Sequence, residues 1–271
     1  SLLIKKNFLF YPIWFIFCYC FGRLAIYEWA EREPLDVFLS ILVSSNFTFG
    51  TYLVLYPLWF LPTLLFSELI FLKLYNRFGE NSNLLKAVVI SVILGFILGI
   101  FLQLPLGIDI SLFAQIFLFV GHSIRKNNFL DRLNFCSCLI LFAVTLGITF
   151  LNSPVAMHAR LYSNPILFYI GGIAGSLLLM KISIWLTNLN NKVFDFVKYC
   201  GKESMAILIF HIPIIAIAYN FTVAINPEND ELGLRLLASE FEFFIIVCGV
   251  IIPVLIAKNF GDKPLIKYFC S

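Results

Sequence analysis

The chain alternates long apolar runs with short polar connections. Eight of the apolar runs are long enough to cross the ~30 Å hydrocarbon core of a bilayer as helices, if modest tilt and interfacial residues are allowed. They are residues 8–27, 57–74, 84–102, 108–124, 134–152, 165–186, 204–221 and 239–257. The pattern predicts an all-α fold, a polytopic integral membrane bundle of about eight transmembrane helices that forms a single domain over residues 1–271.

Composition and charge placement favour the same architecture. Hydrophobic residues make up 61% of the chain and charged residues 13%, whereas charged residues approach about a quarter in soluble domains. If the N-terminus is cytoplasmic and the segments alternate, 15 of the 19 Lys and Arg lie on the cytoplasmic side. Only Arg32, Arg160 and Arg235 lie outside, and Arg23 lies within the first segment. The positive-inside rule therefore predicts that both ends are cytoplasmic.

The segment 57–74 carries a carboxylate at membrane depth. Glu68 lies about 13 Å along a helix from Trp59, close to the middle of the bilayer. Ionisable groups at that depth cost about 2.5–3.5 kcal/mol each on insertion scales, so Glu68 calls for a reason. Trp59, Thr63 and Ser67 follow at helical spacing and form one polar-tolerant stripe beside Glu68. Catalysis and a helix-packing face with a buried hydrogen bond both explain this pattern.

His211 is a second ionisable residue inside a predicted span. It lies about 10 Å beyond Ser204 along the helix, where an imidazole can act as a general base or bind a polar group. Alternatively it satisfies the Ile209 carbonyl, which loses its helical partner because Pro213 has no N–H. His122 lies near a segment end, where snorkelling explains it.

The remaining candidates stand at segment ends and in connections. Asp109 begins the segment 108–124, where a helix N-cap is the simpler explanation. Arg160 and Tyr162 lie in an outer connection, where Arg160 can engage a sugar or an anion, or simply be solvated. Lys198 and Lys202 can meet the phosphates of a cytoplasmic cofactor or belong to the ordinary positive-inside excess.

Four stretches, in this order, resemble the membrane acyltransferase 3 family, and within it the fucose 4-O-acetylase-like branch. The stretches are LWFLP at 58–62 with Glu68 following, IDI at 108–110 through to Gly121 and His122, residues 157–175, and GKESM at 201–205 leading to HIP at 211–213. Together they span nearly the whole chain.

The resemblance implies an O-acyltransferase of a bacterial inner membrane. The acyl donor would be acyl-CoA, typically acetyl-CoA, without a metal, and the acceptor a hydroxyl of a cell-surface or exported glycan, with no nucleic acid involved. The expected catalytic residues are His211 and Glu68. The expected substrate-binding residues are Trp59, Asp109, Arg160, Tyr162 and Ser204, with Lys198 and Lys202 towards the donor.

The chain also departs from the family. Intact members have ten helices, and the first two, with an Arg and a His thought to be catalytic, have no counterpart here, while residues 1–13 resemble the lead-in to the third helix. We therefore expect an N-terminally truncated domain that lacks its general base and can be inactive alone, with His211 a secondary candidate. The alternatives are a transporter or lipid- or glycan-handling protein, in which Glu68 and His211 form a polar relay, and a structural subunit.

Overall fold

The computed structural model describes residues 60–189, 191–204, 207–208, 210–211, 214–215 and 242–260. Within these residues the secondary structure is helical, and β-type pairing is limited to one isolated antiparallel bridge between Ala156 and Leu161. The first predicted segment, Trp59 and most of the segment 204–221 lie outside the described residues.

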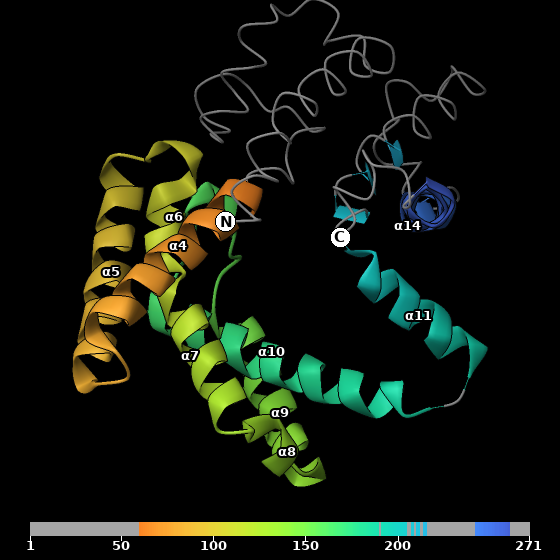
Figure 1. Ribbon diagram of the computed structural model, residues 1–271, viewed down its shortest axis with the longest axis horizontal. Coiled ribbons are helices and arrows are strands. Elements are labelled where there is room, and N and C mark those ends of the chain that lie inside the picture. Colours follow the sequence, from red (N-terminus) through yellow and green to blue (C-terminus); the bar gives the residue numbers. More distant parts are fainter. Residues whose placement is uncertain are drawn as a thin grey trace, which may run out of the picture. The chain divides into compact units, whose positions relative to one another are not determined.

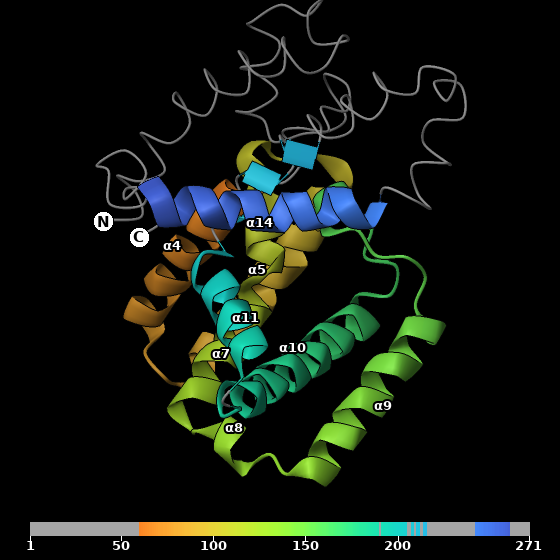
Figure 2. The same cartoon turned by 90° about the vertical axis from the view of Figure 1, so that its right-hand side faces the viewer.

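The described helices belong to two units (Figures 1 and 2). The unit of residues 60–194 contains α4 (Phe60–Phe78), α5 (Ser82–Phe101), the 3₁₀ turn η2 (Pro105–Gly107), α6 (Ile108–Phe113), α7 (Gln115–Lys126), α8 (Phe129–Arg132), α9 (Phe135–Leu151), the 3₁₀ turn η3 (Met157–Ala159) and α10 (Pro165–Thr187). Most of α11 (Lys192–Lys202) and all of α14 (Glu242–Phe260) belong to the other unit.

Among the described residues, two helices are long and apolar enough to cross a membrane. They are α5 and α10, with 20 and 23 residues. The bent pair formed by residues 105–113 and α7 would be a third span if it is counted as one. Helix α9 is apolar but shorter, with 17 residues. Helices α5, α9 and α10 coincide within two residues with three predicted segments; the total of eight stays a prediction.

The predicted span 108–124 is not one continuous helix. It is divided into α6 and α7, and residues 105–113 are bent by 52° from α7. The backbone before α6 also turns sharply, because Leu106 and Gly107 have φ angles of 59° and 63°. At the break, the side-chain Nε2 of Gln115 donates to the carbonyl of Ser111 at 2.8 Å. A side chain that binds a carbonyl of the helical ladder is a known cause of helix bending.

Two glycines of α5 allow α6 to lie directly on its backbone. A Cβ atom on Gly95 would lie 2.6 Å from the carbonyl oxygen of Asp109, and a Cβ on Gly99 would lie 3.2 Å from Asp109 Oδ2. Any larger residue at position 95 would push the helices apart. Small residues one helical turn apart are typical of close contacts between membrane helices.

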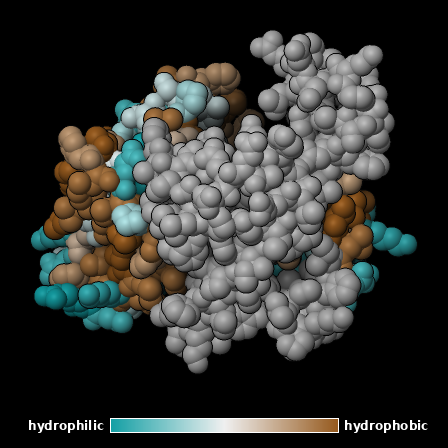
Figure 3. Space-filling model, turned by 90° about the horizontal axis from the view of Figure 1, so that it is seen from above, coloured by the Kyte–Doolittle hydropathy of each residue, from teal (hydrophilic) through white to brown (hydrophobic). Residues whose placement is uncertain are grey.

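Many large apolar side chains are exposed on the described part, and hydrophobic patches lie beside hydrophilic ones on the face that Figure 3 shows. Phe150, Phe101 and Ile166 are 81%, 77% and 69% exposed. The buried cluster is small and aromatic, with Phe113, Tyr162 and Tyr169 at its centre. Apolar side chains that remain this exposed fit a surface that meets lipid rather than water.

Helix α11 was not predicted from the sequence. It spans 11 residues, and its charged side chains alternate with apolar ones that stay exposed, including Val193, Phe196 and Val197. This pattern is typical of a helix that lies along a membrane surface or against a partner. It was missed because it is too short and too charged to count as a span.

Candidate functional site

A buried ion pair joins α6 to the connection between α9 and α10 (residues 152–164). Arg160 Nε donates to Asp109 Oδ2 at 2.8 Å, and Nη2 donates to Oδ1 at 3.2 Å. The two side chains are 4% and 0% exposed. This two-point contact matches the planar guanidinium to the planar carboxylate, which is the strongest geometry for such a pair. The pair therefore fixes residues that lie 51 positions apart in the chain.

Arg160 also binds backbone carbonyls. Nη1 donates to the carbonyl of His158 at 3.2 Å, and Nη2 donates to the carbonyl of Leu104 at 3.4 Å. With the two bonds to Asp109, these contacts use four of the five N–H donors of the guanidinium. Arg160 thus ties together the α5–α6 connection, α6 and the α9–α10 connection, and its charge is neutralised within the protein.

Tyr162 lies beside this pair and stacks on Phe113, with 3.9 Å between the ring centroids. Its hydroxyl is buried and has no hydrogen-bond partner in the described part of the chain. Burial, with the negative charge of Asp109, raises the pKa of the Tyr162 phenol. Burial, with the positive charge of Arg160, lowers the pKa of His158, so that imidazole is neutral at pH 7.

A second set of polar contacts lies between α4 and α6. Ser111 Oγ donates to the Thr63 and Gly107 carbonyls at 2.9 and 2.8 Å. Gln115 Nε2 also donates to the Ser67 carbonyl at 3.1 Å, while its buried Oε1 has no partner among the described residues. Thr63 and Ser67, members of the predicted stripe, therefore face α6. Ser111 and Gln115 were not selected from the sequence, although a Gln within an apolar run was a usable signal.

The expectation that Asp109 caps a helix is wrong. The cap position of α6 is occupied by Gly107, and Asp109 lies within the first turn with its side chain bonded to Arg160. The alternative that Arg160 is solvated is also wrong, because the residue is only 8% exposed. Asp109, Arg160 and Tyr162 do lie together, and their role in binding a substrate stays a prediction.

Glu68 lies on α4 next to the buried Ser67. Its side chain is half-buried, and no hydrogen bond or ion pair joins it to another described residue. The carboxylate is thus outside the network that Ser67 and Ser111 form. The catalytic role predicted for Glu68 remains untested.

His211, in the other unit, is half-buried and bonded to its own helix. Its Nδ1 lies 2.8 Å from the carbonyl of Ile207 and 3.0 Å from that of Leu208. A carbonyl can only accept, so Nδ1 carries a proton, and in the tautomer with one proton the lone pair of the ring lies on Nε2. Helix α14 passes close by, since a Cβ on Gly249 would lie 3.0 Å from Ile215 Cγ1 and 3.8 Å from His211 Cβ.

The other predicted residues are exposed or not described. Lys198 lies within α11, Lys202 is its last residue and Ser204 follows it, and all three residues are exposed. Lys198 forms an ion pair with Asp195 at 3.2 Å. Trp59 lies outside the described residues. The roles predicted for all four residues stay predictions.

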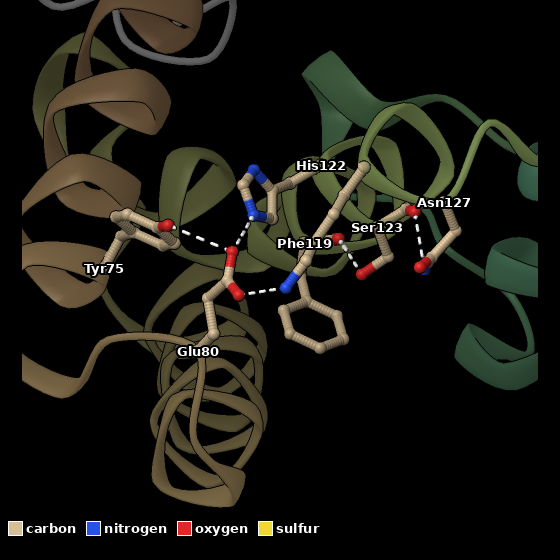
Figure 4. A network of polar contacts seen from close by, with 7 residues as sticks. Tyr75, Glu80, Phe119, His122, Ser123 and Asn127 are labelled. Atoms are coloured by element: carbon tan, nitrogen blue, oxygen red, sulfur yellow. Dashed lines mark hydrogen bonds and ion pairs between the residues drawn. The ribbon is translucent and has the colours of Figure 1, made fainter.

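An exposed polar cluster lies where the α4–α5 connection meets α7 (Figure 4). The carboxylate of Glu80 accepts from Lys126 and from the Tyr75 hydroxyl, and it lies 3.4 Å from His122 Nε2. These hydrogen bonds, that from Lys126 first, lower the pKa of Glu80. His122 also packs edge-on against the Tyr75 ring, 5.0 Å between centroids. Its snorkelling was predicted, but its partners were not.

Comparison with known proteins identifies one family. The model of an acyltransferase domain family, acyltransferase 3, matches residues 3–258. No curated protein and no solved structure matches the chain. Within the described residues, no three His, Cys, Asp or Glu side chains group together in a way that could hold a metal ion.

Proposed function

The chain belongs to the acyltransferase 3 family, and we propose that it is a membrane O-acyltransferase that moves an acetyl group from acetyl-CoA to a hydroxyl of a cell-surface or exported glycan. The observation that carries this proposal is the family match, which extends over residues 3–258 of 271. The apolar helices agree with it, because their length and composition suit an integral membrane protein.

We further propose the orientation that the charge distribution supports. Both ends face the cytoplasm of a bacterial inner membrane, and the connection 152–164 faces outwards. The donor then arrives from the side of Lys198, Lys202 and the Glu80 cluster, and the acceptor from the side of Arg160. The resemblance to the fucose 4-O-acetylase-like branch supports a sugar acceptor.

The proposed chemistry is direct attack of the acceptor on the thioester. A base removes the acceptor O–H proton, the oxygen forms a bond to the acetyl carbonyl carbon, the C–S bond breaks, and the CoA thiolate takes up a proton. His211 is suited to the first step, because the Nδ1 contact with the Ile207 carbonyl makes Nε2 the ring nitrogen that can accept a proton. Glu68 is the second candidate, because its half-buried carboxylate has no described partner that would occupy it.

The test measures transfer of a radiolabelled acetyl group from acetyl-CoA to glycan. The membranes contain either the 271-residue chain or the product of the longest reading frame that includes it. We expect His211→Ala to lower transfer by about 10²–10⁴-fold if it is a general base. Glu68→Gln keeps the shape of the side chain and should lower transfer if the carboxylate takes part.

Ser183→Ala serves as the matched control, because Ser183 is exposed and bonds only to its own helix at Leu179. Equal transfer by wild type, control and both variants would remove His211 and Glu68 from the mechanism. No transfer by any form, with no hydrolysis of acetyl-CoA, would overturn the proposed function.

A further inference from the structure

A cavity lies between α9 and α10, at the ends that adjoin the connection 152–164. Its volume is about 500 Å³, and its walls include Ile148, Thr149, Asn152, Ser153 and Phe168. Ligand sites typically have volumes of roughly 300–1,000 Å³. None of the lining residues is charged, and none was a candidate from the sequence.

Two consecutive glycines give this cavity part of its wall. A Cβ on Gly171 would lie 2.9 Å from Ile148 Cγ2, and a Cβ on Gly172 would lie 2.9 Å from Phe117 Cε1. Helix α10 therefore presents bare backbone here, close to its neighbours on both sides. Phe168, one turn earlier on α10, also lines the cavity, and its ring packs on Tyr162 with 5.7 Å between the ring centroids. The cavity thus adjoins the aromatic cluster beside the buried ion pair.

The polar groups of the cavity suit a hydroxyl group. Asn152 Oδ1 accepts the backbone N–H of Asn164 at 3.0 Å, which leaves the side-chain NH₂ available as a donor. Thr149 Oγ1 donates to the Thr145 carbonyl at 2.9 Å, which leaves its lone pairs as acceptors. The Asn152 NH₂ donor and the Thr149 Oγ1 acceptor lie on successive turns, so they match a ligand hydroxyl, which can both accept and donate a hydrogen bond.

We propose that this cavity binds the acyl acceptor as a neutral glycoside that carries a hydrocarbon chain. The sugar hydroxyls would lie at Thr149 and Asn152, and the hydrocarbon along Ile148 and Leu167. A wall without charged side chains does not suit the phosphates of a nucleotide, which bind Arg or Lys. This assignment rests on the proposed function, because acyl transfer is what calls for a hydroxyl-bearing acceptor.

Binding can be tested without an acyl donor. The probe is n-octyl β-D-glucoside that carries a diazirine on its hydrocarbon chain, used below its micelle-forming concentration. The protein in lipid nanodiscs is mixed with this probe and irradiated, and the labelled peptides are mapped by mass spectrometry. We expect labelling of residues 145–155 and 165–172 that unlabelled octyl glucoside suppresses, whereas glucose alone and octyl trimethylammonium do not. Equal suppression by octyl trimethylammonium would mean simple partition of the chain into an apolar gap and would overturn the proposal.

Two variants in the cavity sharpen the test. Thr149→Trp fills the space and Thr149→Val removes only the hydroxyl, while Thr187→Val is the control at the far end of α10. We expect about tenfold weaker labelling for Thr149→Trp, which corresponds to about 1.4 kcal/mol, and unchanged labelling for the control. If Thr149→Trp unfolds at the wild-type temperature, unchanged labelling of this variant would overturn the site. If Thr149→Trp unfolds at a lower temperature, unchanged labelling of Thr149→Val would overturn it instead.

Hydrolysis of acetyl-CoA separates the two proposals. If the cavity binds the acceptor, Thr149→Trp lowers acetyl transfer to octyl glucoside, whereas the control Thr187→Val, outside the cavity, leaves both transfer and hydrolysis of acetyl-CoA unchanged. Specific labelling with no transfer or hydrolysis would contradict the proposed function alone. Transfer without specific labelling would contradict only the cavity as the acceptor site.

Discussion

The Asp109–Arg160 pair and the Glu80–Lys126 pair perform similar tasks in different surroundings. Each joins residues about as far apart in the chain, 51 and 46 positions. The side chains of the first pair are 4% and 0% exposed, whereas Lys126 and Glu80 are 52% and 42% exposed. The first pair is held within packed protein, and the second lies at the surface.

The difference in burial changes what each pair contributes. A buried charge that loses its partner is left unsolvated, so breaking such a pair is costly even where forming it gains little. At the surface, water and salt replace the partner. The contacts of α6 thus depend on the Asp109–Arg160 pair, whereas the Glu80 cluster can be altered with little effect on the fold.

The largest expected effect comes from breaking the buried pair. Arg160→Met should lower the free energy of unfolding by about 3–5 kcal/mol, because Asp109 becomes an unpaired buried charge. The measurement is the thermal unfolding of purified protein in detergent. The double variant Asp109→Leu with Arg160→Met should recover much of the loss. A single variant as stable as wild type would show that the pair does not hold α6.

The next effect tests the close contact beneath α6. Gly95→Ala should cost about 1–3 kcal/mol, because the added methyl overlaps the Asp109 carbonyl and forces the helices apart. Gly147→Ala, in α9, is the control, because a Cβ there has nothing within 4 Å among the residues that the structure describes. It should be neutral or stabilise by up to about 1 kcal/mol, since Ala favours helix over Gly. Equal effects of the two changes would contradict the contact.

Two tyrosines of the aromatic cluster differ by one hydrogen bond. The Tyr169 hydroxyl donates to the Phe113 carbonyl at 2.6 Å, and the Tyr162 hydroxyl has no described partner. Tyr169→Phe should therefore cost about 1 kcal/mol, and Tyr162→Phe should be close to neutral or stabilising. Unfolding of the two variants under one set of conditions checks this. A larger loss for Tyr162→Phe would reveal a partner for its hydroxyl.

The smallest effect is expected in the exposed cluster. The hydrogen bonds to Glu80 lower its pKa in the folded protein below its ordinary value. Its stabilising contribution is therefore present above the pKa of the unfolded chain and is lost as the pH falls through the folded-state pKa. Glu80→Gln should leave stability at pH 7 almost unchanged and remove this acid dependence. The acid dependence is measured by unfolding wild type and Glu80→Gln at pH values from 7 to 3.5, at low and high salt. A large loss of stability at pH 7 in Glu80→Gln would contradict the expectation that the exposed Glu80–Lys126 pair contributes less than the buried Asp109–Arg160 pair.

Part of the candidate site could be selected from residue types and their places in the segments. Asp109 stood out at the start of an apolar run, and Arg160 and Tyr162 in the connection between two runs. Thr63 and Ser67 stood out as part of a stripe at helical spacing. Nothing in the local pattern indicated that Asp109 would meet Arg160, because one sequence carries no record of contacts across 51 positions. The pairing of Glu80 with His122 was missed for the same reason.

The sequence by itself determined where helices α5, α9 and α10 form, because a helix closes its backbone hydrogen bonds within its own segment and an apolar run of sufficient length suits lipid. Only the tertiary structure decided the break between α6 and α7, the burial of Arg160 and the cavity beside Gly171. Each of these depends on which face of one helix meets another, and that is set by packing between distant segments.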